Sequence, residues 1–155
     1  MNIFVTDENP VIAAQNLCDK HVVKMILESA QMLCAAFENG EAPYRRSHFN
    51  HPCTKWTRAS QPNYKWLLTH AYAMCAEYSH RYHKTHKSAE VITWCENNYH
   101  KLNLPDIGLT LFAQAMPDQY KNKNTTQAYR DYYNGEKASF AKWKSQIIPE
   151  WFTGP

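Results

Sequence analysis

The spacing of apolar residues is helical over most of this chain. The longest such stretch runs from Asn9 to Phe37 and predicts one long helix, with Asn9 as N-cap, Pro10 in the first helical position and an end near Asn39 and Gly40. Apolar residues flank this predicted helix on two sides, so it should pack against neighbours on several sides. We therefore expect the rest of the chain to be organised around it.

A narrow polar stripe interrupts the apolar surface of this predicted helix. At helical spacing its members fall within about 80° of one another; they are His21, Lys24, Glu28 and Gln31. Polar groups on a buried helix are costly unless they pair or line a cleft. Two interpretations stay open. The stripe is either a structural network with Lys24 and Glu28 as an i,i+4 pair, or the floor of a site in which Glu28 is the acid/base or electrostatic group.

Three shorter helical stretches follow, and strand-like alternation of apolar and polar residues is missing from the chain. The predicted helices run from Ser60 to about Tyr82, from Ser88 to about Lys101, and from Thr125 or Thr126 to about Ser145, with a long ordered loop from Leu102 to Lys123. We predict an all-α fold, a single compact domain of about four main helices around the long N-terminal helix. This domain spans residues 1–152, and residues 153–155 form a loose tail.

The segment between Asn39 and Gln61 loses helical periodicity and is rich in basic and aromatic residues. Its candidate substrate-binding residues are Arg45, Arg46, His48, His51, Lys55, Trp56 and Arg58. A loop of this composition suits contacts with phosphate groups, although a solvated connector is the alternative. Trp66 and His70, on the next predicted helix, are further candidates because they can face the polar stripe.

Composition narrows the class of protein. The chain has 155 residues, five scattered cysteines and a formal charge of +3. It contains neither a long apolar run nor a signal-peptide pattern, which predicts a cytoplasmic protein without a membrane segment. Cysteines without a C-x-x-C pair indicate reduced, mostly buried thiols, and we expect no metal and no cofactor. The mild basicity, with five Trp and ten Tyr, is compatible with a nucleic-acid partner.

One short motif resembles a known family. Asp19-x-His21 is followed seven residues later by Glu28, after a short extended N-terminal segment. This pattern is similar to that of the small all-helical pyrimidine-dimer DNA glycosylases of the phage ultraviolet-endonuclease type. A looser match covers the stretch from His51 to Lys84. The whole chain also resembles small uncharacterised phage-encoded proteins that carry CDKHVVKM, an AMPDQYK-like loop and a PEWF end, a likeness that brings no established chemistry.

The resemblance implies a DNA glycosylase that cleaves the N-glycosidic bond of a damaged or modified base in duplex DNA, with strand cleavage as a lyase left open. Glu28 then matches the catalytic glutamate and His21 the assisting histidine. The nucleophile in that family is the amine of a small residue exposed by methionine removal. Asn2 is bulky and should block that removal, so the Met1 amine, Lys24 or water takes this role. Asn2 and Gln31 complete the expected substrate-binding residues.

Two other classes of function remain open from the sequence. One is a non-catalytic nucleic-acid or nucleotide-binding phage factor that keeps the polar cleft without turnover. The other is a glycosidic hydrolase or transferase that acts on free nucleotides. If the protein is a glycosylase, its binding to duplex DNA should be salt-sensitive and Glu28→Gln should abolish product formation. If it only binds its ligand, its affinity for that ligand should be unchanged in Glu28→Gln.

Overall fold

The computed structural model describes residues 1–144 and 147–154, and within these the chain forms six α-helices and no strand. The helices are α1 (Pro10–Gln15), α2 (Asp19–Cys34), α3 (Pro52–Thr57), α4 (Gln61–Tyr82), α5 (Ala89–Asn97) and α6 (Thr125–Tyr132). Two short 3-10 turns occur at Tyr99–Lys101 and Asp118–Tyr120, and a π-helical turn, Tyr133–Lys137, extends α6. The predicted all-α fold is confirmed.

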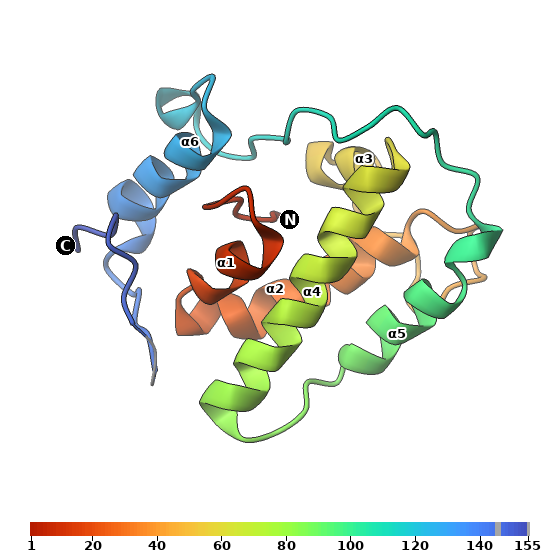
Figure 1. The fold of residues 1–155 in the computed structure, drawn as a ribbon, viewed down its shortest axis with the longest axis horizontal. Helices are drawn as coiled ribbons and strands as arrows, with labels where there is room; N and C mark the ends of the chain where they lie inside the picture. The colour runs from red at the N-terminus through yellow and green to blue at the C-terminus, as the bar shows by residue number, and fades with distance from the viewer. Residues whose placement is uncertain (145–146, 155) are drawn as a thin grey trace.

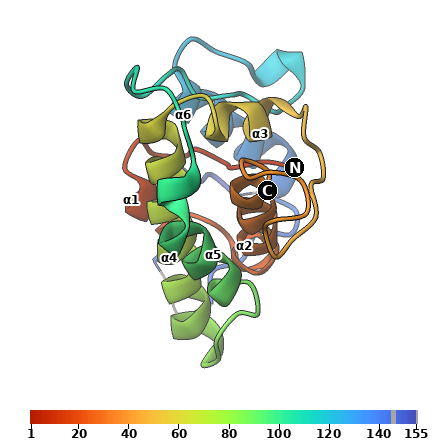
Figure 2. The ribbon, with the colours of Figure 1, turned by 90° about the vertical axis from the view of Figure 1, so that its right-hand side faces the viewer.

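The two longest helices, α2 and α4, form the centre of the molecule. In Figure 1, α4 crosses in front of α2, with α1 and α6 to one side and α5 to the other. The view in Figure 2 shows α5 next to both long helices and α3 at the upper end of the bundle. The first residues of the chain are enclosed by these helices, and Ile3, Phe4 and Val5 are buried. The N-terminus therefore lies inside the fold.

The single long helix predicted from Asn9 to Phe37 is wrong, because the chain breaks between Gln15 and Asp19 into α1 and α2. The start was predicted correctly: Asn9 is the N-cap, and its side chain accepts from the backbone N–H of Val11 and Ile12. The break contains no Gly or Pro, so its cause is not local. Groups from distant parts of the chain form hydrogen bonds with the backbone at the break, in place of the hydrogen bonds of a continuous helix.

Arg81, from α4, is the main partner of this break. Its buried guanidinium donates to the carbonyl oxygens of Gln15 and Leu17 at 3.2 and 2.8 Å, and to the Asp19 carboxylate at 3.1 Å. Glu77, one turn earlier on α4, accepts from the same guanidinium at 2.9 Å. The end of α1 and the start of α2 are thereby held against α4, with a cation at one helix end and an anion at the next.

The remaining helix boundaries match the prediction in part. Ser60 caps α4 through its hydroxyl, and Ser88 precedes α5. The last helix is shorter than predicted, since α6 ends at Tyr132 and continues only as the π-helical turn to Lys137; Ser145 lies outside the described residues. The end of the Tyr120 side chain lies where a Cβ at Gly135 would stand, so a larger residue at this position requires that ring to move.

The predicted loops pack against the helices only in part, because Ile107, Leu109 and Leu111 are exposed. The Asn39–Gln61 segment contains the short helix α3, which the sequence analysis missed, and the Leu102–Lys123 segment crosses from α5 to α6 in extended form. Near the C-terminus, the backbone N–H of Thr153 donates to Asn134 at 2.9 Å. None of the helices described here is both long and apolar enough to cross a membrane.

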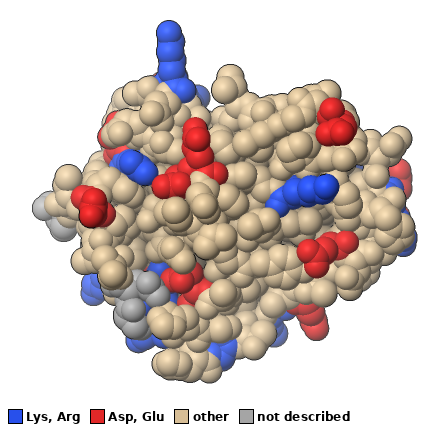
Figure 3. Space-filling model, in the orientation of Figure 1, with Lys and Arg blue, Asp and Glu red and all other residues tan. Residues whose placement is uncertain are grey.

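Charged side chains are spread thinly over the face that α4 occupies. Figure 3, in the orientation of Figure 1, shows Lys and Arg as isolated side chains on this face, with Asp and Glu scattered between them. No basic patch is visible among the described residues of this face.

Candidate active site

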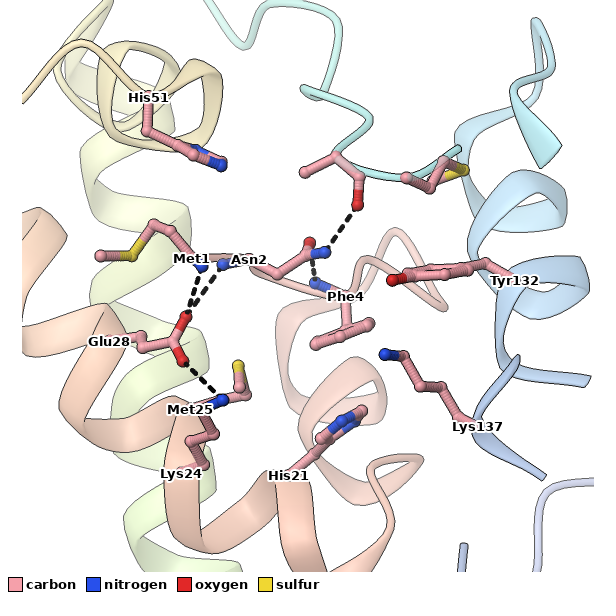
Figure 4. A pocket seen from close by; sticks show the side chains of 12 residues that line it. Met1, Asn2, Phe4, His21, Lys24, Met25, Glu28, His51, Tyr132 and Lys137 are labelled. Carbon is pink, nitrogen blue, oxygen red and sulfur yellow. Dashed lines mark hydrogen bonds and ion pairs between the residues drawn. The ribbon is translucent and has the colours of Figure 1, made fainter. Parts of the chain in front are cut away.

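A pocket of about 440 Å³ lies where the N-terminal segment meets α2, close to α3, the loop before α6, and α6 itself. Its volume falls in the range of small-molecule sites. Figure 4 shows the lining side chains converging from these separate segments. They are Met1, Asn2, Phe4, His21, Lys24, Met25, Glu28, His51, Ala115, Met116, Tyr132 and Lys137.

Glu28 is the centre of the pocket's charge arrangement. One carboxylate oxygen lies 3.2 Å from the Met1 amine and accepts from the backbone N–H of Asn2 at 3.1 Å. The second oxygen lies 3.9 Å from the ammonium of Lys24, one turn earlier on α2. The side chain of Glu28 is only 9% exposed, whereas that of Lys24 is 67% exposed. A nearly buried carboxylate thus faces an amine at the end of the chain.

Asn2 fixes the course of the N-terminal segment. Its side-chain oxygen accepts from the backbone N–H of Ile3 and Phe4, at 2.8 and 3.2 Å, and its amide donates to the Ala115 carbonyl at 2.8 Å. These bonds hold Phe4 at a φ of 56°, which is unusual for a bulky residue. Strain of this kind persists only where the surroundings over-determine it. The position of the Met1 amine is therefore set by packing and by Asn2 together.

His21 lies two turns before Glu28, on the same side of α2. Its ring stacks on Phe4 at 4.3 Å, and Nδ1 lies 2.6 Å from the Tyr133 hydroxyl. That hydroxyl accepts from the Cys18 N–H, and its own proton has two acceptors within reach, Nδ1 of His21 and the Cys18 sulfur at 3.4 Å. Burial, assisted by the charges of Lys137, Lys24 and Lys20, lowers the pKa of His21 to about 3. The ring is therefore neutral at physiological pH.

Two buried histidines predict an acid-sensitive fold. Burial lowers the pKa of His70 to about 4, as it lowers the pKa of His21 to about 3. Both pKa values lie below the unfolded value of 6.5, so the stabilisation is complete above pH 6.5 and is lost as the pH falls toward the folded values. We expect the free energy of unfolding to fall by up to about 1.4 kcal/mol per pH unit for each histidine.

Urea unfolding between pH 6.5 and 5, above the range in which most carboxylates titrate, measures this dependence. In His70→Gln the slope should be roughly halved, whereas His100→Gln, which alters an exposed histidine, should leave it unchanged. An unaltered slope in His70→Gln contradicts the expectation.

The basic loop places only one of its predicted binding residues in the pocket. His51 lines it, with Nδ1 accepting from the Cys53 N–H at the start of α3. Arg46 and Arg58 instead lie over the ring of Phe49, at 4.4 and 3.8 Å, and donate to the carbonyls of Phe37 and Phe49. The other members of the set, Arg45, His48 and Lys55, are exposed outside the pocket lining.

Three of the predicted substrate-binding residues, Trp56, Trp66 and His70, are buried in the core. Trp56 and Trp66 pack with Phe112 of the long loop, with ring centroids 5.1 Å from that residue in each case. His70 stacks on Trp66, and its Nδ1 donates to the Pro10 carbonyl at 2.9 Å. None of these side chains lines the pocket. Gln31 is half-buried one turn beyond Glu28 and is also outside the lining.

Two polar lining residues were not predicted from the sequence, Tyr132 and Lys137. Both come from α6 and the π-helical turn, far from α2 in sequence. Figure 4 shows the Tyr132 hydroxyl and the Lys137 ammonium pointing toward the centre of the pocket from the side opposite Glu28. No local pattern marks them, because their relevance depends on how α6 packs against the N-terminal segment.

Comparison with known proteins gives one match. The sequence model of the pyrimidine dimer DNA glycosylase family matches residues 1–91, more than half of the chain. The matched stretch contains Glu28, His21, Lys24 and the N-terminal segment that approaches them. No curated protein and no solved structure matches the chain. The family assignment agrees with a carboxylate held against an amine at the end of an all-helical chain, and the chain belongs to the pyrimidine dimer DNA glycosylase family.

Proposed function

We propose that this protein cleaves the N-glycosidic bond of a damaged pyrimidine in duplex DNA, with the Met1 amine as nucleophile and Glu28 as the stabilising carboxylate. The observation that carries the proposal is the 3.2 Å distance between the Met1 amine and the Glu28 carboxylate in the pocket. An amine and a carboxylate at this separation can exchange a proton directly. Lesions in duplex DNA are the substrate class that family membership supports.

The chemistry requires a neutral amine, and Glu28 is placed to accept its proton. The amine nitrogen attacks C1′ of the deoxyribose, and the bond from C1′ to the base breaks as the base leaves with the bonding electron pair. The base takes up the proton that Glu28 accepted, which returns Glu28 to the carboxylate. The carboxylate stabilises the positive charge that develops on the sugar. As the sugar ring opens, one of the two protons left on the amine passes to the ring oxygen, which gives a protonated imine between the chain and C1′.

We propose strand cleavage as a second step after release of the base. An imine at C1′ makes a proton on C2′ acidic, and removal of that proton expels the phosphate on C3′. Glu28 is the carboxylate in the pocket that can take this proton, since it lies beside the amine that carries the imine. When the Tyr133 hydroxyl donates to Nδ1, neutral His21 carries its proton on Nε2 and can donate it to a sugar or phosphate oxygen.

Lys24 is the competing nucleophile. Its ammonium lies 3.9 Å from the other oxygen of Glu28, but its side chain is 67% exposed. The Met1 amine is held more closely, by the carboxylate and by the bonds that Asn2 makes to the following backbone. Preorganisation of this kind favours the Met1 amine, because a mobile side chain must first be ordered before it can attack.

Borohydride reduction tests the proposal, because it converts a transient imine into a stable link between protein and DNA. Duplexes that are ultraviolet-irradiated, uracil-containing or otherwise modified are offered, and the trapped peptide is identified by mass spectrometry. We expect an adduct on the peptide that begins at Met1, with ultraviolet-irradiated duplex. The adduct should persist in Lys24→Ala and in the control Lys87→Ala, which alters an exposed lysine.

An adduct on Lys24, lost in Lys24→Ala, assigns the nucleophile to that side chain and refutes the role of Met1. No adduct and no released base on any duplex refutes the glycosylase proposal as a whole.

A further inference from the structure

Lys137 forms part of the pocket wall opposite Glu28, and it lies outside the residues that the family comparison matches. It is the last residue of the π-helical turn Tyr133–Lys137, whereas the matched stretch ends at residue 91. A π-helical turn inserts one residue into a helix and rotates the residues after it by about 100°, and such turns often occur at functional sites. The turn thus changes the direction in which Lys137 leaves the helix.

Three aromatic rings surround the Lys137 ammonium. Its nitrogen lies 4.8 Å from the centroid of Tyr132, 5.9 Å from that of Phe4 and 6.0 Å from that of Phe140. Phe4 is the residue held at a positive φ by Asn2, so one wall of this aromatic cage depends on the strained N-terminal segment. Attraction between a cation and aromatic faces positions the ammonium without neutralising it.

Lys137 has no carboxylate partner among the residues that the structure describes. Among the described residues, none of the ion pairs includes Lys137, and the ion-paired carboxylate of Glu28 in the pocket already faces the Met1 amine and Lys24. Lys20 adds a further ammonium 4.7 Å from the Phe140 ring. Positive charges therefore outnumber negative ones around the pocket, which is the arrangement expected of a site that receives an anion.

We infer that Lys137 binds a backbone phosphate of the DNA next to the nucleotide whose sugar lies at Glu28, and that the rings of Phe4, Tyr132 and Phe140 position it for that contact. The inference rests on the proposed function, because it names the group that holds the same substrate. The sequence analysis assigned phosphate contacts to the arginines of the basic loop, yet Arg46 and Arg58 are occupied by Phe49 and by backbone carbonyls.

The location of Lys137 fits a positioning role. In Figure 4 the ammonium points into the pocket from the right, Glu28 lies on the left, and Phe4 and His21 lie between them. A phosphate held at Lys137 and a sugar held at Glu28 are then bound by opposite walls of one pocket. Because the phosphate is charged whatever the base, this contact contributes to affinity for every DNA sequence rather than to recognition of the lesion.

The salt dependence of DNA binding tests the inference. Binding to ultraviolet-irradiated duplex is measured between about 50 and 200 mM salt in a Glu28→Gln background, in which turnover is suppressed. Each phosphate contact contributes about 0.9 to the slope of log K against log salt. We expect Lys137→Gln to lower this slope by about one and to weaken binding about three- to tenfold at the lowest salt, with Lys137→Arg close to the parent.

The controls separate this contact from stability and from the proposed function. Lys65→Gln alters a lysine that lies over Tyr99, away from the pocket lining, and should leave the slope unchanged. If Lys137→Gln unfolds at a lower temperature than its parent, Lys137→Met, which keeps an apolar stem within the aromatic cage, takes its place. If a folded Lys137 variant keeps the parent's slope of log K against log salt, the inference is wrong and the proposed function is unaffected. Failure of the parent to bind any duplex overturns both.

Discussion

Glu28→Gln is expected to reduce base release from ultraviolet-irradiated duplex by about 10²–10⁴-fold while the protein stays folded. The amide keeps the size of the carboxyl group and an oxygen that accepts from the Asn2 N–H, a bond of 3.1 Å in the structure. It cannot take a proton from the Met1 amine, which lies 3.2 Å away, and it cannot balance positive charge on the sugar. The loss should therefore appear in the chemical step.

Single-turnover kinetics at saturating protein measures this loss without a contribution from binding. Thermal unfolding of the same variant checks that the fold is retained. Glu90→Gln is the matched control, since Glu90 is exposed in the first turn of α5 and should show unchanged rates. If Glu28→Gln releases base at the parental rate, the carboxylate has no part in the reaction.

The polar floor of the site could be predicted because it lies on one helix. His21, Lys24 and Glu28 have the period of α2, and all three line the pocket. The predicted spacing of these residues stays correct although the start of α2 was predicted wrongly. The break at residues 16–18 lies before α2 and does not separate the three residues. Sequence periodicity reports which side chains share a face, whatever the tertiary structure does further along the chain.

The break itself could not be predicted from the sequence. Asn16, Leu17 and Cys18 are all tolerated in helices, and the groups that bind their backbone come from far away. Arg81 donates to the Leu17 carbonyl, and the Tyr133 hydroxyl accepts from the Cys18 N–H at 3.2 Å. A hydrophobic pattern that is analysed over a few helical turns includes neither Arg81 nor Tyr133, because both lie far away in the sequence.

The same limit applies to the predicted phosphate contacts, of which only His51 lines the pocket. The composition of the basic loop is that of a phosphate-binding segment, but composition does not say which way an arginine points. Two of its arginines close over Phe49 and satisfy local carbonyls. The aromatic residues of that region also fill space in the core, an alternative that the sequence left open. Lys137, by contrast, enters the pocket only because α6 packs against the first residues of the chain.

The largest expected effect on stability is that of Arg81→Met. The arginine side chain is fully buried and donates to Glu77, Asp19 and two backbone carbonyls. Removing one member of a buried ion-paired cluster leaves uncompensated charge in the interior and costs about 3–5 kcal/mol. Urea unfolding at neutral pH measures this change. Arg45→Met, at an exposed position, should stay within about 0.5 kcal/mol of the parent.

A second substitution distinguishes lost charge balance from lost packing. In Arg81→Met with Glu77→Met, the carboxylate that Arg81 pairs with along α4 is also absent, so the double variant should be less destabilised than the sum of the two single variants. Additive losses would instead mean that Arg81 acts through Asp19 and the carbonyls of Gln15 and Leu17 and not through Glu77. Either result bears on the active site, because these contacts set where α2 begins, and α2 carries both His21 and Glu28.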